Sequence, residues 1–337
     1  METSNAKSQK KKRYSLTSIL SIVLNGLLIT ALGLSAFWVF DYKKSKDGEI
    51  ARLNEIIRLT NENNIIIPIF DFKEYVTRYG NIAQFAQRYF PDELVYPGYG
   101  GIKFIPLDES LKKGNIKGEK IVYEGSRAYY QDGNYQALLG IDVSTHQRSI
   151  NWEKVKNDGI EFAMIRVGFR GYTVGKIYLD DTFNQNIAGA NEVGIPVGVY
   201  FFSGAINQQE AIQEAEFVLR QIKDYKVDLA IAFDMEDISA ENNRMKNLTT
   251  AEKTAIALAF CQRIEAAGYK AVVYGNAKWL LESLTYSEVA KYGIWYANWN
   301  YLHWPYELYA YQYTSSGTVD GINGRVDMNL GFFNYGE

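Results

Sequence analysis

Short apolar runs alternate with stretches of helical periodicity through the C-terminal part of the chain, from about residue 135 onward. Amphipathic stretches at 152–158, 180–193, 208–223 and 250–267 predict four helices. The apolar runs predict eight strands, at 138–143, 162–167, 196–202, 229–233, 270–274, 293–297, 308–313 and 325–328. Alternating strands and helices indicate a parallel sheet with helical cover, and eight strands favour closure into a barrel.

The last three predicted strands are joined by segments too short to hold full crossover helices. Parallel neighbours need such crossovers, whereas antiparallel neighbours can be joined by short turns. We therefore expect an α/β fold, a TIM-like barrel over residues 137–337 that becomes irregular in its last third.

A long uncharged segment, residues 15–40, lies near the amino terminus. As a helix it would extend about 39 Å, more than the roughly 30 Å hydrocarbon core of a bilayer. Five basic residues and one acidic residue precede it in 1–14. The sequence therefore predicts a cytoplasmic tail, a single transmembrane helix in the cell membrane and an extracytoplasmic remainder. A cleaved signal peptide, with a weak small-residue site at Ala31-Leu32-Gly33, is the alternative.

Two regions separate this segment from the expected barrel. Residues 41–64 are predicted to form a stalk helix or linker, and residues 65–136 a small extracytoplasmic region of unassigned role. Within the second region we expect an amphipathic helix at 71–90, a turn at 97–101 and strands at 102–105, 120–124 and 127–130. Residues 41–136 are a candidate contact surface for other envelope proteins.

Composition excludes several classes of function. The net charge is −3, and no basic face suited to nucleic acid is evident beyond the tail. The single cysteine, Cys261, excludes an intramolecular disulfide and is expected to be a buried thiol. The two histidines, His146 and His303, are far apart, and no zinc or phosphate-binding motif is present, so neither metal nor cofactor is expected.

Paired carboxylates follow the fourth predicted strand. Asp234 and Glu236 are two positions apart, so their side chains share one face of the strand. Like charges this close raise one pKa and leave the other group ionised, which supplies the proton donor and anion that glycosidic cleavage needs. Active sites of such barrels lie at the carboxyl ends of the strands, so Asp142 and Asp327 should join this pair.

Seven short motifs then occur in the order found in one enzyme family. They are GIDVS at 140–144, FAMIR at 162–166, GVYFF at 198–202, DME at 234–236, WYA at 295–297, YQYT at 311–314 and GRVDMN at 324–329. Over roughly residues 137–335 the chain resembles glycoside hydrolase family 25, the Chalaropsis-type lysozymes or N-acetylmuramidases. The resemblance implies a (β/α)5(β)3 barrel. It also implies metal-free hydrolysis, with retention, of the β-1,4 bond between N-acetylmuramic acid and N-acetylglucosamine in peptidoglycan.

The resemblance also implies roles for the acids. Glu236 matches the family's general acid, and Asp142, Asp234 and Asp327 match its other three site carboxylates. Retention needs either a carboxylate nucleophile or help from the 2-acetamido group of the substrate. We favour the second route, in which Asp234 orients the acetamide.

Candidate substrate-binding residues accompany these acids. Aromatic rings that could stack on sugars, or equally pack the barrel, are Tyr200, Phe202, Trp295 and Tyr311. Asn298 and Gln312 could bond sugar hydroxyls, and His146 is expected at the rim. Many family members carry His where Phe201 stands and Trp where Tyr311 stands.

The sequence thus predicts a cell-wall muramidase displayed outside the cytoplasmic membrane. Three alternatives stay open: an inactive glycan-binding barrel, a retaining glycosidase for another polymer of 2-acetamido sugars, and a scaffold in which 43–137 bind a partner.

Overall fold

The computed structural model describes residues 86–87, 89–299 and 301–333, together with Lys46, Ile50, Asn54 and Arg58, which are helical and exposed. The chain divides into two compact units, residues 1–82 and 83–337, and the expected barrel lies in the second. The predicted tail 1–14, the predicted span 15–40 and nearly all of 41–85 lie outside the described residues. Within the described part of the chain, no helix combines the length and apolarity needed to cross a membrane.

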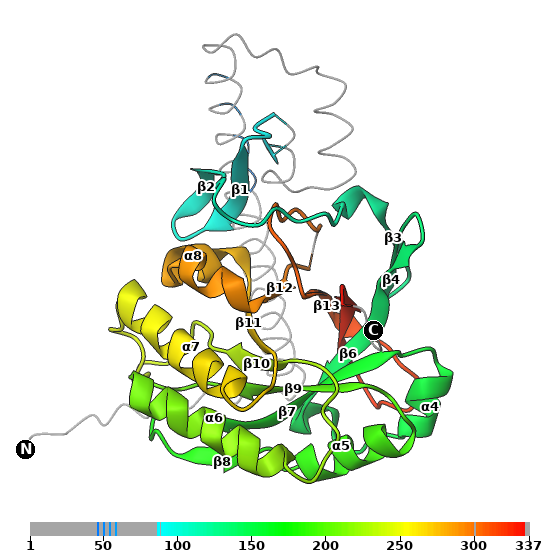
Figure 1. Cartoon of the computed structure of the whole chain (residues 1–337). Coiled ribbons are helices and arrows are strands. Elements are labelled where there is room, and N and C mark those ends of the chain that lie inside the picture. The colour runs from blue at the N-terminus through cyan, green and yellow to red at the C-terminus, as the bar shows by residue number, and fades with distance from the viewer. Residues whose placement is uncertain are drawn as a thin grey trace, which may run out of the picture. The chain divides into compact units, whose positions relative to one another are not determined.

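Eight strands close into a barrel (Figure 1). They are β6 (Leu138–Val143), β7 (Phe162–Arg170), β9 (Val197–Phe202), β10 (Ile231–Asp234), β11 (Ala271–Gly275), β12 (Ile294–Ala297), β13 (Ala310–Gly317) and β14 (Val326–Gly331). The order is β6-β14-β13-β12-β11-β10-β9-β7, and pairing of β7 with β6 completes the ring. Only β14 is antiparallel to its neighbours in this ring, which confirms the irregular end of the barrel. The short β8 (Ile177–Leu179) adds to β7 outside the ring.

Helices follow the first five barrel strands and cover the outside of the barrel (Figure 1). They are α4 (Trp152–Asn157), α5 (Phe183–Glu192), α6 (Gln208–Ile222), α7 (Thr250–Glu265), and, after β11, a π-helical turn η3 (Trp279–Ser283), α8 (Tyr286–Val289) and η4 (Ala290–Tyr292). Helix α7 begins with a capping box, in which the Thr249 side chain accepts from the Glu252 backbone and Glu252 accepts from the Thr249 backbone. The connectivity is (β/α)5(β)3.

Five short strands precede the barrel within the same unit. β1 (Glu93–Gly98) and β2 (Gly101–Pro106) form an antiparallel hairpin, and the predicted turn at 97–101 is its tip. β3 (Ile121–Glu124), β4 (Arg127–Asp132) and β5 (Tyr135–Gln136) form a second antiparallel sheet, preceded by η1 (Gly118–Lys120). This sheet contacts the barrel where the Ala128 N–H donates to the Tyr313 hydroxyl (3.1 Å) and Arg127 pairs with Asp158 (2.6 Å).

The barrel interior changes from apolar to polar along three of its parallel strands, β7, β10 and β11. Phe162, Met164, Ala232, Val272 and Trp295 pack together inside. Side chains alternate along a strand, so the residue two positions further on also faces inward and lies closer to the carboxyl end. After Met164, Ala232 and Val272 these inward residues are Arg166, Asp234 and Tyr274. The sequence period therefore places polar groups at the mouth of the barrel, above an apolar floor.

Candidate active site

The structure brings the four predicted carboxylates to one mouth of the barrel. Asp142 on β6 lies opposite Asp327 on β14 in the antiparallel register, and a side-chain hydrogen bond joins them. Asp234 is the last residue of β10, and Glu236 follows it in the loop. A second side-chain hydrogen bond joins Asp234 to Glu236. The site is therefore built from two carboxyl pairs that act on each other electrostatically.

Burial raises the pKa of all four acids, and the charges of neighbouring acids add to the rise for Asp234, Glu236 and Asp327. Burial is the largest cause for each, and it raises the pKa of Asp327 to about 8. The pKa of Asp234 lies well above its usual range because burial is reinforced by the charges of Glu236 and Asp142. The surface of Glu236 is open to solvent, but the surrounding walls still remove enough water to raise its pKa. Both pairs can therefore hold protons at pH values at which isolated carboxyls are ionised.

Two buried amides hold Asp142 in place. Asn329 Nδ2 and Gln312 Nε2 both donate to Asp142 Oδ2, at 2.8 and 2.9 Å. Asn329 Oδ1 in turn accepts from Trp295 Nε1 (2.8 Å), and Gln312 Oε1 accepts from the Tyr274 hydroxyl (2.9 Å). Because both ends of the Gln312 amide are bonded to protein groups, its position suits orienting Asp142 better than contacting a sugar hydroxyl.

The other predicted binding residues lie at different depths. Trp295 is only 2% exposed inside the barrel, and Tyr311 is fully buried on the outer side of β13. In the structure both rings take the second of the two roles that the sequence left open, packing of the barrel, because neither offers a free face on which a sugar could stack. Tyr200 is also buried, edge-on to Trp295 with ring centroids 5.8 Å apart. Phe202 is half-buried and lies beside Asp234 in the strand register, so it remains a candidate for stacking on a sugar ring.

Asn298 is half-buried and lines a groove at the mouth, and its Nδ2 donates to the Tyr301 carbonyl (3.1 Å). His146 is exposed in the short helix η2 (Thr145–Gln147) directly after β6, in keeping with a position at the rim. Cys261 is a buried thiol within α7, as predicted.

Three further residues at the mouth were not among the site residues predicted from the sequence. Arg166 has Nε and Nη2 2.8 Å from Asp180 Oδ2, and its positive charge opposes the rise in the pKa of Asp234. Tyr274 holds Gln312, and Trp299 Nε1 also donates to Gln312 Oε1 (3.2 Å). The period of two along β7 and β11 could have identified Arg166 and Tyr274, whereas Trp299 lies in an aperiodic connection.

A groove of about 600 Å³ extends from Glu236 along the carboxyl ends of β11 and β12. Its lining comprises Pro97, Gly98, Glu236, Asp237, Tyr274, Gly275, Asn276, Ala277, Lys278, Trp279, Tyr296, Ala297, Asn298 and Trp299. Flat rings, amides and a carboxylic acid together suit an oligosaccharide, which presents both apolar C–H faces and hydroxyl groups.

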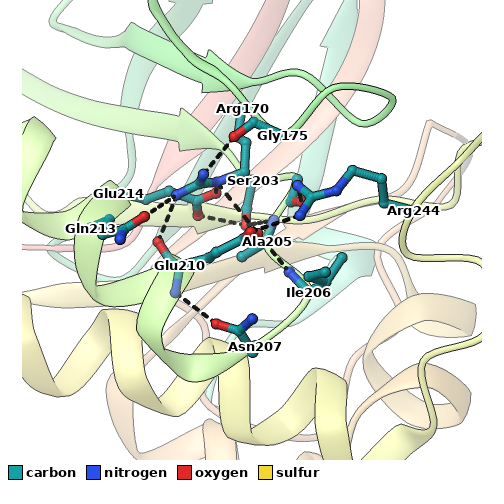
Figure 2. Close-up of polar contacts among 11 residues, drawn as sticks. Arg170, Gly175, Ser203, Ala205, Ile206, Asn207, Glu210, Gln213, Glu214 and Arg244 are labelled. Carbon is teal, nitrogen blue, oxygen red and sulfur yellow. Dashed lines mark hydrogen bonds and ion pairs between the residues drawn. The ribbon is translucent and has the colours of Figure 1, made fainter.

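A buried ion pair supports the end of β9, which pairs with the strand end that carries Asp234. Figure 2 shows the two members of the pair, Arg170 and Glu214. Arg170 Nε lies 2.7 Å from Glu214 Oε1, and the Ser203 hydroxyl donates to Glu214 Oε2 (2.7 Å). Ser203 also donates its backbone N–H to the Asp234 carbonyl (2.7 Å). Burial raises the pKa of Glu214 to about 7, although Ser203 and Arg170 both act to lower it. The pair thus links the end of β9, helix α6 and the end of β10 in one hydrogen-bonded unit.

The loop that follows Glu236 is held by the same network (Figure 2). Arg244 Nη2 lies 2.6 Å from Glu210 Oε1 at the start of α6, and the Arg244 backbone N–H donates to the Tyr172 carbonyl (2.9 Å). Glu210 also accepts from the Ile206 backbone (3.1 Å). These contacts restrain the β7–β8, β9–α6 and β10–α7 connections relative to each other, which favours a preformed mouth.

An α/β barrel with paired carboxyls of raised pKa at its mouth is an arrangement that glycoside hydrolases use. Residues 141–322 match the family model of Glycosyl hydrolases family 25, and this segment is more than half of the chain. The chain belongs to this family and is a glycoside hydrolase, which confirms the resemblance seen in the motifs.

Individual relatives agree with this placement. The chain is 30% identical over 208 residues to Lysozyme M1 of Streptomyces globisporus, covering 57% of this chain and 67% of that protein. It is 24% identical over 194 residues to the autolytic lysozyme of Clostridium acetobutylicum, covering 57% and 55%. The modular autolysin LytC from Streptococcus pneumoniae, solved with a synthetic peptidoglycan ligand, superposes with a TM-score of 0.54 at 26% identity. That superposition covers 71% of this chain and 56% of LytC, so only just over half of LytC and of the clostridial enzyme is spanned.

Proposed function

We propose that this protein is a muramidase that hydrolyses the β-1,4 bond between N-acetylmuramic acid and N-acetylglucosamine in peptidoglycan with retention. The observation that carries the proposal is the hydrogen-bonded pair of Asp234 and Glu236, both with raised pKa, at the mouth of a family 25 barrel. Its relatives include a lysozyme, an autolytic lysozyme and an autolysin solved with a peptidoglycan ligand, and they support the same substrate class.

Glu236 is suited to be the general acid. Its raised pKa keeps the carboxyl protonated at higher pH than that of an ordinary glutamate, and its open surface lets a substrate reach it. It would donate its proton to the glycosidic oxygen as the C–O bond breaks, so that the leaving sugar departs with a new hydroxyl group. The resulting Glu236 carboxylate would then take a proton from the water that completes hydrolysis.

Asp234 is suited to assist the substrate's own acetamide. Its Oδ1 atom is buried and is one of the few such atoms without a hydrogen-bond partner among the described residues. A buried acceptor left unpaired is costly, and an N–H group of the substrate would satisfy it. The 2-acetamido N–H would donate to Oδ1 while the acetamide oxygen bonds to the anomeric carbon and the leaving oxygen departs. Water would then open this cyclic intermediate with overall retention.

Asp142 and Asp327 would complete the site. Their shared hydrogen bond leaves the pair with less charge than two free carboxylates, which limits repulsion against Asp234 and Glu236. In this arrangement they would hold substrate hydroxyls and set the proton occupancy of the cluster.

Display outside the cell membrane is the second part of the proposal. An uncharged segment at 15–40 with basic residues before it would place the barrel on the side of the peptidoglycan. Single-cysteine variants Ser4→Cys and Glu241→Cys, made in a Cys261→Ala background, test this orientation in intact cells. A membrane-impermeant thiol reagent should label position 241 alone, and labelling of position 4 alone would reverse the orientation. Contacts with envelope proteins through residues 41–136 stay a prediction.

The bond cleaved can be identified from the products. The full chain is incubated with purified peptidoglycan, and the soluble fragments are reduced and analysed by mass spectrometry. Reduced muramic acid at the fragment ends is the expected result. Reduced glucosamine would mean that the other glycosidic bond is cut, and cleavage of chitin but not peptidoglycan would assign the enzyme to another polymer of 2-acetamido sugars.

A further inference from the structure

The β1–β2 hairpin lies outside the family-matched segment but is fixed to the barrel beside the active site. At its tip, the Tyr99 backbone N–H donates to both carboxylate oxygens of Glu282, at 3.1 and 3.2 Å. The Tyr96 side chain forms a further hydrogen bond to Glu282. Gly98 packs so closely that any larger residue would collide with this carboxylate. The hairpin is therefore docked on η3 through one acidic residue.

This docking makes the hairpin a wall of the catalytic groove. Pro97 and Gly98 line the same groove as Glu236 and Trp299. A chain that occupies the site at Glu236 and continues along the groove would therefore pass between the barrel and the hairpin.

Two exposed aromatic rings lie at this part of the groove: Trp299 belongs to its lining, and Tyr99 lies next to it, since it contacts the lining residue Lys278. Trp299 is 59% exposed, and its indole nitrogen is anchored to Gln312. Tyr99 is 42% exposed, and the Lys278 ammonium lies 4.1 Å from the centre of its ring and 3.5 Å from Asp237 Oδ2. Flat aromatic rings suit the C–H faces of pyranose sugars, and both rings are exposed at a groove that a glycan chain can follow from Glu236.

We propose that Trp299 and Tyr99, held by the docked hairpin, form an additional glycan-binding subsite for sugar units beyond the pair cleaved at Glu236. The ligand is a further stretch of the same chain of 2-acetamido sugars, because the groove that carries these rings begins at the proton donor itself. The inference rests on the proposed function and extends it: the enzyme should prefer long glycan strands to short ones.

Binding measurements on the full chain carrying Glu236→Gln test this without turnover. Isothermal titration gives Kd for purified peptide-free glycan strands and for a single disaccharide of N-acetylmuramic acid and N-acetylglucosamine. Tyr99→Ala and Trp299→Ala should each reduce the preference for the long strand about fivefold to tenfold, as expected for loss of one stacked ring. Trp299→Phe keeps a flat ring without the bond to Gln312, and should retain most of the preference. Tyr129→Ala, which removes an exposed tyrosine from β4, is the matched control and should leave it unchanged.

Equal binding of long and short glycans by the Glu236→Gln chain would overturn the inference. The inference would also be overturned if Trp299→Ala weakened binding of the long strand and of the disaccharide by the same factor. Trp299 would then contact the two sugars on either side of the cleaved bond. Failure of the wild-type chain to cut peptidoglycan, with the long-strand preference still lost in Tyr99→Ala and Trp299→Ala, would instead reject the proposed function and keep the subsite.

Discussion

Replacement of Asp142 by asparagine is expected to stabilise the fold at alkaline pH while it lowers activity. Asp142 Oδ2 accepts hydrogen bonds from Gln312 and Asn329, and the side-chain oxygen of an asparagine can accept the same two bonds. The new amide group would face Asp327, where it can donate a hydrogen bond to the ionised carboxylate. The substitution therefore preserves the shape and removes one charge from the cluster.

The size of the stabilisation expected in Asp142→Asn follows from the pKa of Asp327. Its folded pKa is raised from 3.8 to about 8, first by burial and then by the charge and hydrogen bond of Asp142. The folded chain thus keeps a proton that the unfolded chain releases, so this group makes stability fall as pH rises from about 4 to about 8. One pKa unit corresponds to about 1.4 kcal/mol. Burial, the largest cause of the shift, remains in Asp142→Asn, so the variant removes only the smaller part of the displacement and gains on the order of 1–2 kcal/mol above pH 8.

The assay is urea unfolding of the full chain at pH 5 and pH 9, followed by tryptophan fluorescence. Asp142→Asn should raise the free energy of unfolding at pH 9 by far more than at pH 5. Glu241→Gln, which neutralises an exposed acid in the loop after Glu236, is the control and should show no such difference. A variant that is equally or less stable at pH 9 than wild type would refute the reasoning about charge repulsion in this cluster.

Three further predictions concern the groups around the acids. Asn329→Ala leaves the buried Trp295 Nε1 without its acceptor and creates a small cavity, so the free energy of unfolding should fall by about 2–4 kcal/mol. A loss below about 1 kcal/mol in urea titration would contradict the role given to this amide. Ser203→Ala removes a hydrogen-bond donor to Glu214 and should raise the pKa of Glu214 further above about 7. The variant should lose about 1 kcal/mol of stability at pH 8 and less at pH 5. Equal losses of stability at the two pH values would count against this role of Ser203. The pH profile of kcat/KM should fall on its alkaline side as Glu236 loses its proton, with a midpoint above the ordinary glutamate range; a fall already at pH 4 would contradict the assignment of this residue as the acid.

The barrel strands could be predicted because each carries a buried apolar run. The strand predicted at 138–143 has the same bounds as β6, and the same period of two that defines a strand also places Asp142 and Asp234 at the mouth. The short connections late in the chain indicated an irregular end of the barrel but not which strand would be antiparallel, and the structure shows that it is β14. This antiparallel direction accounts for the presence of Asp327 at the mouth even though Asp327 lies near the start of its strand.

Other features depend on contacts between residues distant in the sequence. Trp299 and the hairpin tip reach the groove through connections without periodicity, and the bond between Asn329 and Asp142 spans 187 residues. The alternation along β13 decides between the two roles that the sequence left open for Tyr311, stacking on a sugar and packing of the barrel. Gln312 faces the barrel interior, so its neighbour Tyr311 must face outward, where its hydroxyl donates to the Asn298 carbonyl (2.7 Å).

The central claim is that Glu236 supplies the proton for cleavage, and the most direct test separates catalysis from binding in Glu236→Gln. Turnover is followed as release of reducing-end muramic acid from purified peptidoglycan, and Kd is measured on the same preparation. We expect kcat to fall about 10³-fold, the scale of general acid catalysis, with Kd changed less than about threefold, while Glu241→Gln retains full turnover. A Glu236→Gln enzyme that cleaves peptidoglycan at the wild-type rate would contradict the account.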